Sequence, residues 1–125
     1  MAENKPVVRR AGDVPDEAIS VARDATIKIH LSKDQGLPNF EIREFTIQPG
    51  GRIPSHRHDV LEHGQLVLEG EMTILLGDEV FTVCAGDSVF LPEGTAHWYE
   101  NRGGTPVRFL CVIPRKPYQT EWLEK

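Results

Sequence analysis

Apolar and polar residues alternate with a period of two along much of this chain, the pattern of half-buried β-strands. The alternation is clear in residues 26–31, 40–48 and 108–113. Glycine and proline clusters, such as residues 49–51 and 92–94, punctuate the chain at the spacing of strand-connecting turns. No sustained helical period lies between residues 25 and 114. The pattern therefore predicts an all-β barrel or sandwich.

The same alternation predicts which side chains point inward. In the last strand Arg108 should face solvent, so Phe109 and its alternate neighbours should face the interior. Arg43 has the same inward parity as Phe45 in an earlier strand. The predicted wall of an internal pocket consists of Arg43, Ile53, Gln65, Val67, Phe109, Cys111 and Ile113.

The strand pattern divides the chain into three predicted parts. Residues 1–24 are read as an N-terminal arm, in which residues 16–21 could form one helical turn. Residues 25–116 should form the barrel, and residues 117–125 a C-terminal tail. A chain of 125 residues is the right length for one domain with one core.

Charge and composition exclude several classes of partner. The chain has 14 Lys and Arg against 19 Asp and Glu, a net charge of -5 with no basic stripe, so nucleic acid is not expected. The apolar runs are too short for a membrane partner, and the polar N-terminus predicts a cytoplasmic protein. Cys84 and Cys111 both lie in apolar strand positions, so we expect reduced, buried thiols.

Four of the five histidines fall in two short segments, and together they predict a metal site. His56 and His58 are two apart in an extended segment, so both imidazoles should leave the same face of a strand. His63 follows after a short turn, and His97 follows a proline–glycine turn. Imidazole is the commonest protein metal ligand, and a site needs several that converge. Glu62 is the competing candidate for the position of His63.

The spacing of these residues resembles the two sequence motifs of the cupin superfamily. The first motif is carried by Gly50, His56, His58, His63 and Gly70. The second is carried by Gly86, Pro92, Gly94, His97 and Asn101. Most cupins have glutamate as the third ligand where this chain has His63. In this respect residues 37–116 are similar to the small four-histidine monocupins.

This resemblance implies a single cupin-type β-barrel, also called a double-stranded β-helix or jelly roll. It also implies one divalent transition metal per chain, bound by His56, His58, His63 and His97. We expect manganese first and iron next, because an octahedral ion with four protein ligands keeps two positions open. Nickel, copper or zinc could load into recombinant protein, and tetrahedral zinc would instead make the site closed and structural.

Three functions are compatible with such a site. The first is a manganese- or iron-dependent oxygenase of the dioxygenase type, acting on a small apolar substrate with a C=C or enol group. The second is a redox-neutral isomerase or lyase of a sugar or hydroxy acid, in which the metal acts as a Lewis acid. The third is a non-enzymatic module that binds a small molecule or metal. The apolar pocket wall favours the first, and no catalytic residue is assigned.

Individual pocket residues keep two interpretations each. Arg43 either anchors a substrate anion or forms a rim ion pair with Glu41 or Glu44. Gln65 orients a bound water or satisfies a backbone group, and Cys111 is expected to pack rather than react.

The expected partners are a small-molecule substrate and a second copy of the chain. A homodimer is predicted from the N-terminal arm and from outward apolar side chains at Leu66, Leu68 and Trp98.

Overall fold

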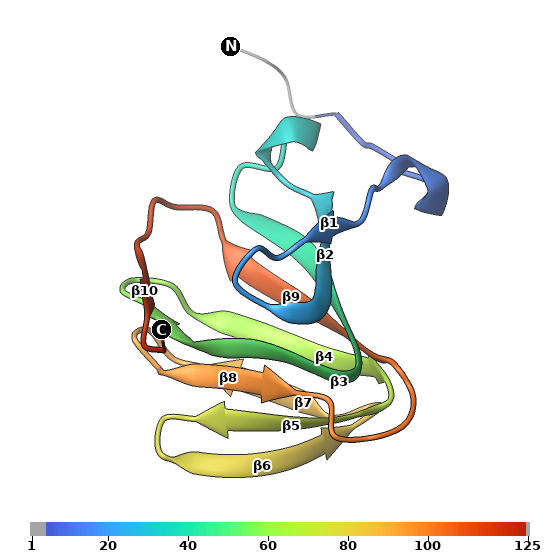
Figure 1. Cartoon of the computed structure of the whole chain (residues 1–125). Coiled ribbons are helices and arrows are strands. Elements are labelled where there is room, and N and C mark those ends of the chain that lie inside the picture. The colour runs from blue at the N-terminus through green and yellow to red at the C-terminus, as the bar shows by residue number, and fades with distance from the viewer. Residues whose placement is uncertain (1–4, 125) are drawn as a thin grey trace.

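A computed structural model describes residues 5–124 as one curled, almost entirely β structure (Figure 1). The strands are β1 (Glu17–Ala18), β2 (Arg23–Leu31), β3 (Phe40–His58), β4 (His63–Glu69), β5 (Glu71–Leu76), β6 (Glu79–Cys84), β7 (Ser88–Leu91), β8 (His97–Glu100), β9 (Val107–Pro114) and β10 (Thr120–Trp122). Two short 3-10 helices, η1 (Ala11–Asp13) and η2 (Lys33–Gln35), flank β1 and β2. The all-β prediction is confirmed, and the three alternating segments lie in β2, β3 and β9.

Neighbouring strands in the sheet are mostly distant in sequence. The order is β6-β5-β8-β3-β9-β4-β7, while β1 pairs with β2, and both β2 and β10 pair with β3. The sheet curls, with β9 and β4 above β8 and β5 in Figure 1, around an interior in which Val67, Phe109, Met72 and Tyr99 of these strands form one buried cluster. Side chains from both halves meet in that interior.

Strand β3 belongs to both halves of the curled sheet. Its first part pairs with β2 and β9, and its second part pairs with β8 and β10. Gly50 and Gly51 lie between the two parts. Gly50 has φ +81°, and a Cβ on Gly51 would lie 2.7 Å from the Asp24 carbonyl oxygen. Only glycine fits both constraints, so this pair lets one strand change partners and direction.

The closed end of the interior is an apolar core. The Phe109 ring lies between Phe45 and Tyr99, with centroid distances of 5.1 and 5.0 Å. Ile47 and Met72 are fully buried in the same cluster. Apolar burial of this kind drives the folding of the barrel. It also fixes the floor on which the site is built.

Two local expectations from sequence were wrong. Residues 16–21 do not form a helical turn: Glu17 and Ala18 form β1, which pairs with Ile27 and Thr26 of β2. Backbone pairing with β2 prevails over the weak helical tendency of so short a segment. Cys84 is exposed rather than buried, because it ends the edge strand β6 just before the turn to Asp87. No helix within residues 5–124 is long and apolar enough to cross a membrane.

Candidate metal centre and substrate cavity

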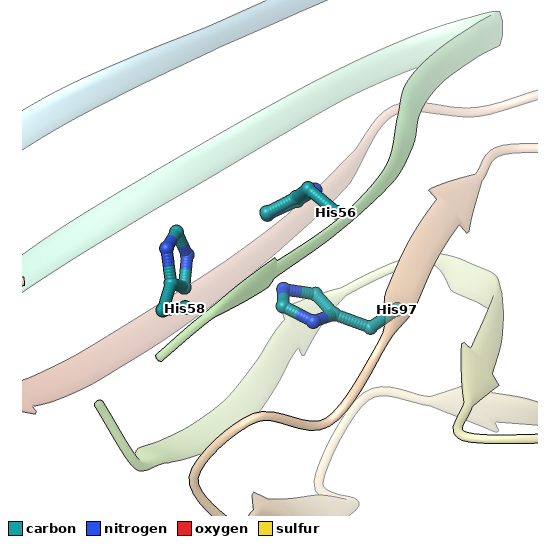
Figure 2. A group of neighbouring side chains, drawn as sticks. All are labelled: His56, His58 and His97. Carbon is teal, nitrogen blue, oxygen red and sulfur yellow. The ribbon is translucent and has the colours of Figure 1, made fainter. Parts of the chain in front are cut away.

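Three strands bring four histidines together at the open end of the interior. His56 and His58 end β3, His63 begins β4, and His97 begins β8 directly across from His56. Ligand nitrogens of His56, His58 and His97 all lie within 4.8 Å of one another. Figure 2 shows these three rings directed into one space from β3 and β8.

His63 lies beside this group and inside the cavity. Its ring centroid is 5.0 Å from that of His58 and 5.4 Å from that of His97. His63 is 3% exposed and lines the cavity, whereas Glu62 is exposed and lies on the outer surface. The placement therefore favours His63 over Glu62 as the fourth candidate ligand.

Hydrogen bonds hold two of the rings in the tautomer that a metal requires. The Nδ1 atoms of His56 and His97 lie 2.8 Å from the carbonyl oxygens of Pro54 and Thr95. A carbonyl can only accept, so each Nδ1 carries the proton and each Nε2 keeps its lone pair. The Nδ1 of His58 lies 2.9 Å from the Thr120 hydroxyl. The Nδ1 of His63 is buried without a partner.

The surroundings keep these imidazoles neutral. Burial lowers the pKa of His58 to about 4, of His97 to about 3 and of His63 to about 2, and it also lowers that of His56. The positive charge of Arg43 contributes to the lowered pKa of all four. Neutral imidazole is the ligating form. The convergence and neutral state of the four residues, with the tautomers of His56 and His97, thus fit a divalent metal ion.

The histidines line a cavity of about 250 Å³ whose wall is partly polar and partly apolar. The apolar part of the wall comes from Ala18, Ile19, Ile27, Phe45, Ile53 and Trp122. The polar part comes from Arg43, Gln65, Tyr99, Cys111, Thr120 and the four histidines, with Glu17 also on the lining. The Gln65 side-chain amide donates to the Tyr99 hydroxyl at 2.6 Å.

Arg43 is a buried cation inside this cavity. Its Nη2 atom donates to the Cys111 sulfur at 3.3 Å, its guanidinium carbon lies 5.3 Å from the Phe45 ring centroid, and its Nε atom has no partner. Glu44 pairs with His30 and Arg108 instead. Within the described part of the chain no carboxylate forms an ion pair with Arg43. The rim ion pair considered from sequence is therefore not formed.

The structure separates the predicted wall into two groups. Arg43, Ile53, Gln65 and Cys111 line the cavity with the four histidines. Val67, Phe109 and Ile113 point inward as their parity indicated, but they are buried in the core rather than on the cavity lining. Parity gives the face of a strand but not the depth along it, and these three positions lie where the interior is filled.

The sequence pattern did not predict several of the residues that line the cavity. They come from three places: β1 with the turn after it, β2, and β10. They are Glu17, Ala18, Ile19, Ile27, Thr120 and Trp122. The alternation in residues 26–31 could have indicated Ile27. The other five lie in segments too short for a periodic pattern.

Known proteins resemble this chain in sequence and in fold. A family model described as the Cupin domain matches residues 43–113. The uncharacterized protein MJ1618 of Methanocaldococcus jannaschii is 30% identical over 112 residues, covering 78% of this chain and 90% of that protein. The oxalate-binding protein of Thermotoga maritima is 31% identical over 129 aligned positions, covering 90% of this chain and 98% of that protein.

A solved structure is similar over almost the whole length. The polyketide cyclase RemF from Streptomyces resistomycificus superposes with a TM-score of 0.85 at 29% identity, covering 97% of this chain and 89% of that one. Several other curated relatives are much longer, and the chain spans less than a quarter of their length.

Proposed function

Because the chain belongs to the cupin family, we propose that it is a metal-dependent enzyme whose substrate is small and mostly apolar and carries an enol, keto or carboxylate oxygen. The metal would be held by His56, His58 and His97, with His63 as fourth ligand. Manganese or iron fits a set of neutral imidazoles that leaves positions open for substrate. When bound, such an ion supplies Lewis-acid chemistry that polarises a substrate oxygen.

One observation carries this proposal. Within residues 5–124, three buried side-chain atoms have no hydrogen-bond partner: Arg43 Nε, His63 Nδ1 and Gln65 Oε1. All three residues line the same cavity. Buried polar atoms are almost always paired, because leaving one unpaired costs about 1–3 kcal/mol. A ligand that brings both an acceptor and a donor into the cavity would satisfy them.

The side chains of the cavity define what that ligand looks like. The Arg43 guanidinium would bind the negative charge of a carboxylate or of a developing enolate oxygen. The Tyr99 hydroxyl accepts from Gln65 and so keeps its own proton to donate, and burial raises its pKa far above the ordinary value. Phe45 and Ile53 would pack on the apolar body of the substrate and exclude water.

The favoured reaction class is redox-neutral chemistry through an enolate, such as cyclisation or isomerisation of a keto compound. The similarity to a polyketide cyclase supports it, because that substrate class is built from enolisable carbonyl groups. Arg43 and Tyr99 would stabilise the oxyanion, while Glu17 is the carboxylate among the described lining residues and the candidate base.

Oxygenation of an enol, the reaction that the sequence favoured, becomes the second candidate. Apart from Glu17 the described lining residues carry no carboxylate, and the wall is largely apolar. An oxygenase needs no strong base when its substrate is already enolic. The same cavity can therefore support this reaction.

Untagged protein loaded with Mn²⁺ or Fe²⁺ tests both reactions. With 2-oxobutanoate in D₂O, we expect deuterium incorporation at C3, the carbon next to the keto group, to be faster with the protein than without it. NMR should show the same rate under argon and a slower rate in Glu17→Gln. Oxygen uptake with acetylacetone would promote the oxygenase. Binding of both probes with neither reaction would leave a binding module and overturn the enzymatic proposal.

A homodimer also remains a prediction. The outer face of β4, β7 and β9 exposes Leu66, Phe90 and Val112, with Phe90 62% exposed. An apolar patch of this kind is typical of an interface. We expect sedimentation at micromolar concentration to show a species of twice 14.0 kDa, and Phe90→Glu to convert it to monomer. A monomeric wild-type protein would refute the prediction.

A further inference from the structure

We propose that strand β10 completes the site, with Thr120 as a positioning residue for His58 and Trp122 as a specificity-determining residue of the cavity wall. The proposal rests on the proposed function, since it assumes that a metal and a substrate share this cavity. It concerns a segment that carries none of the sequence motifs.

The pairing of β10 with β3 places its side chains relative to the histidines. Thr120 lies opposite His58, and Trp122 lies opposite His56, in an antiparallel pair. Side chains alternate along a strand, so Thr120 and Trp122 share the cavity side while Glu121 points away. Accordingly Thr120 and Trp122 line the cavity, and Glu121 forms an exposed ion pair with Arg57.

Thr120 determines the orientation of His58 in a way that has no counterpart at His56 or His97. Those two rings bond to backbone carbonyls two residues before them in the chain. The partner of His58 is instead the Thr120 side chain, 62 residues away in sequence, at 2.9 Å. The tautomer and angle of His58 therefore depend on the docking of β10.

Trp122 packs beside His56, one of the candidate metal ligands. Its ring centroid lies 4.6 Å from that of His56, and its side chain forms part of the cavity lining. Tyr118 contacts His58 in the same segment, with ring centroids 5.1 Å apart. A large rigid aromatic group at this place limits the size and shape of any molecule beside the metal.

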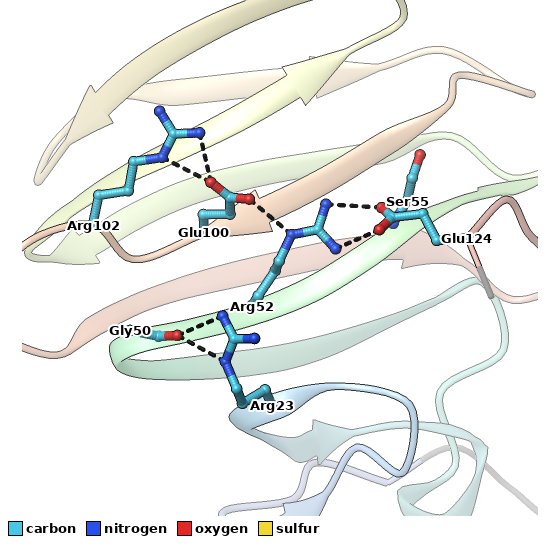
Figure 3. Close-up of polar contacts among 7 residues, drawn as sticks. All are labelled: Arg23, Gly50, Arg52, Ser55, Glu100, Arg102 and Glu124. Carbon is cyan, nitrogen blue, oxygen red and sulfur yellow. Dashed lines mark hydrogen bonds and ion pairs between the residues drawn. The ribbon is translucent and has the colours of Figure 1, made fainter.

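Polar contacts anchor the segment from both ends. The Glu124 carboxylate accepts from Arg52 Nη1 and Nη2 at 2.6 and 2.8 Å and from the Ser55 amide at 2.6 Å. Figure 3 shows Arg52 between Glu124 and Glu100, which accepts from Arg52 Nε at 2.7 Å. At the other end, the Gln119 amide donates to the Asp59 carboxylate at 2.9 Å. The docked position is thus specified by several independent contacts.

Metal affinity tests the role of Thr120. Isothermal titration of metal-free, untagged protein with Mn²⁺ should show Kd raised roughly 10–100-fold in Thr120→Val, the usual effect of losing the hydrogen-bond partner of a ligand. Thr120→Ser should restore a Kd close to wild type. Glu121→Gln, on the same strand but the other face, is the matched control and should bind as wild type.

A metal-free readout separates this proposal from the proposed function. Long-range ¹H–¹⁵N NMR should show the same dominant His58 tautomer in wild type and Thr120→Ser, and a different ratio of tautomers in Thr120→Val. If wild type binds no metal but the tautomer responds, the metal site fails and the positioning contact stands. An unchanged tautomer and an unchanged Mn²⁺ Kd in Thr120→Val would overturn the positioning role.

Substrate size tests the role of Trp122. In Mn²⁺-loaded protein, Trp122→Leu should bind 1,3-diphenylpropane-1,3-dione more tightly relative to acetylacetone, while the Mn²⁺ Kd stays near wild type. The predicted result is a preference ratio shifted by at least about tenfold, as expected for a changed apolar pocket. An unchanged ratio would show that Trp122 does not determine specificity.

Discussion

Two parts of the cavity wall differ in their hydrogen bonding: the part formed by the four histidines (the histidine side) and the part formed by Arg43 and Gln65 (the Arg43 side). On the histidine side, three of four rings have their Nδ1 atoms bonded, so their orientation is fixed before any ligand arrives. On the other side, Arg43 Nε and Gln65 Oε1 are buried without partners. The first arrangement suits an ion of fixed size and geometry. The second leaves a donor and an acceptor without partners, and an organic ligand could bind to both.

Stability and function conflict on the Arg43 side and not on the histidine side. Orienting His56 and His97 uses carbonyls that would need a donor in any case, so these two ligands add little strain. A buried, unpaired guanidinium destabilises the protein without its ligand. We therefore expect substitutions on the histidine side to change metal affinity. Substitutions on the Arg43 side should instead change the affinity for an organic ligand and the stability of the metal-free protein.

The largest effect should come from removing a ring on the histidine side. His97→Ala should raise the Mn²⁺ Kd beyond the roughly 10–100-fold that loss of an outer partner produces, because a ligand itself is lost. Titration calorimetry and metal analysis of untagged protein measure this. His30→Ala removes an imidazole outside the cavity and is the control. Equal Mn²⁺ affinity in both variants would contradict the assignment.

Removing the positive charge of Arg43 should weaken the binding of an organic ligand without weakening metal binding. Arg43→Met should weaken acetylacetone binding to the Mn²⁺ form by roughly 10–100-fold, the value of about 1.5–3 kcal/mol for a bond to a charged group. The Mn²⁺ Kd should stay equal or fall, because a nearby positive charge is gone. The melting temperature of the metal-free protein should rise. A lower melting temperature with unchanged acetylacetone affinity would make Arg43 a structural residue.

A third prediction concerns the pH dependence of metal-free stability. Cavity histidines have lowered pKa values, about 3 for His97 and about 2 for His63, against about 6.5 in an unfolded chain. As pH falls below 6.5 the unfolded state takes up protons first, so the free energy of unfolding should decrease. Each such histidine contributes up to about 1.4 kcal/mol per pH unit.

Urea unfolding between pH 6.5 and 5 measures this slope above the ordinary titration range of carboxyl groups. His63→Gln should give a flatter profile than wild type, with His30→Gln as the matched loss of one imidazole. A wild-type profile that is flat over this range would show that the cavity histidines titrate normally.

The sequence predicted the features that follow from period-two alternation and from motif spacing. The alternation in residues 40–48 placed Arg43 and Phe45 on the inner face, and both residues line the cavity. Motif spacing brought together histidines from three strands, because turns of fixed length bring those strands into register.

The rest depended on tertiary structure. Period-two parity could not tell Cys111, on the cavity wall, from Phe109 two residues earlier, in the core. The contributions of Glu17 and Trp122 come from segments of two and three strand residues, which are too short to show a period. Their positions are set by pairing with β2 and β3, and pairing across such distances leaves no local signal.

The continuity of β3 fixes a length inside the protein. Arg43 and His56 are carried by the same strand, separated only by the change of direction at Gly50 and Gly51. The span between Arg43, the proposed anion anchor, and His56, a proposed metal ligand, is therefore set by the covalent backbone of one strand. Exchanging surface loops should leave this measure unchanged. Molecules whose two oxygen groups are spaced differently should be excluded however well their apolar parts fit.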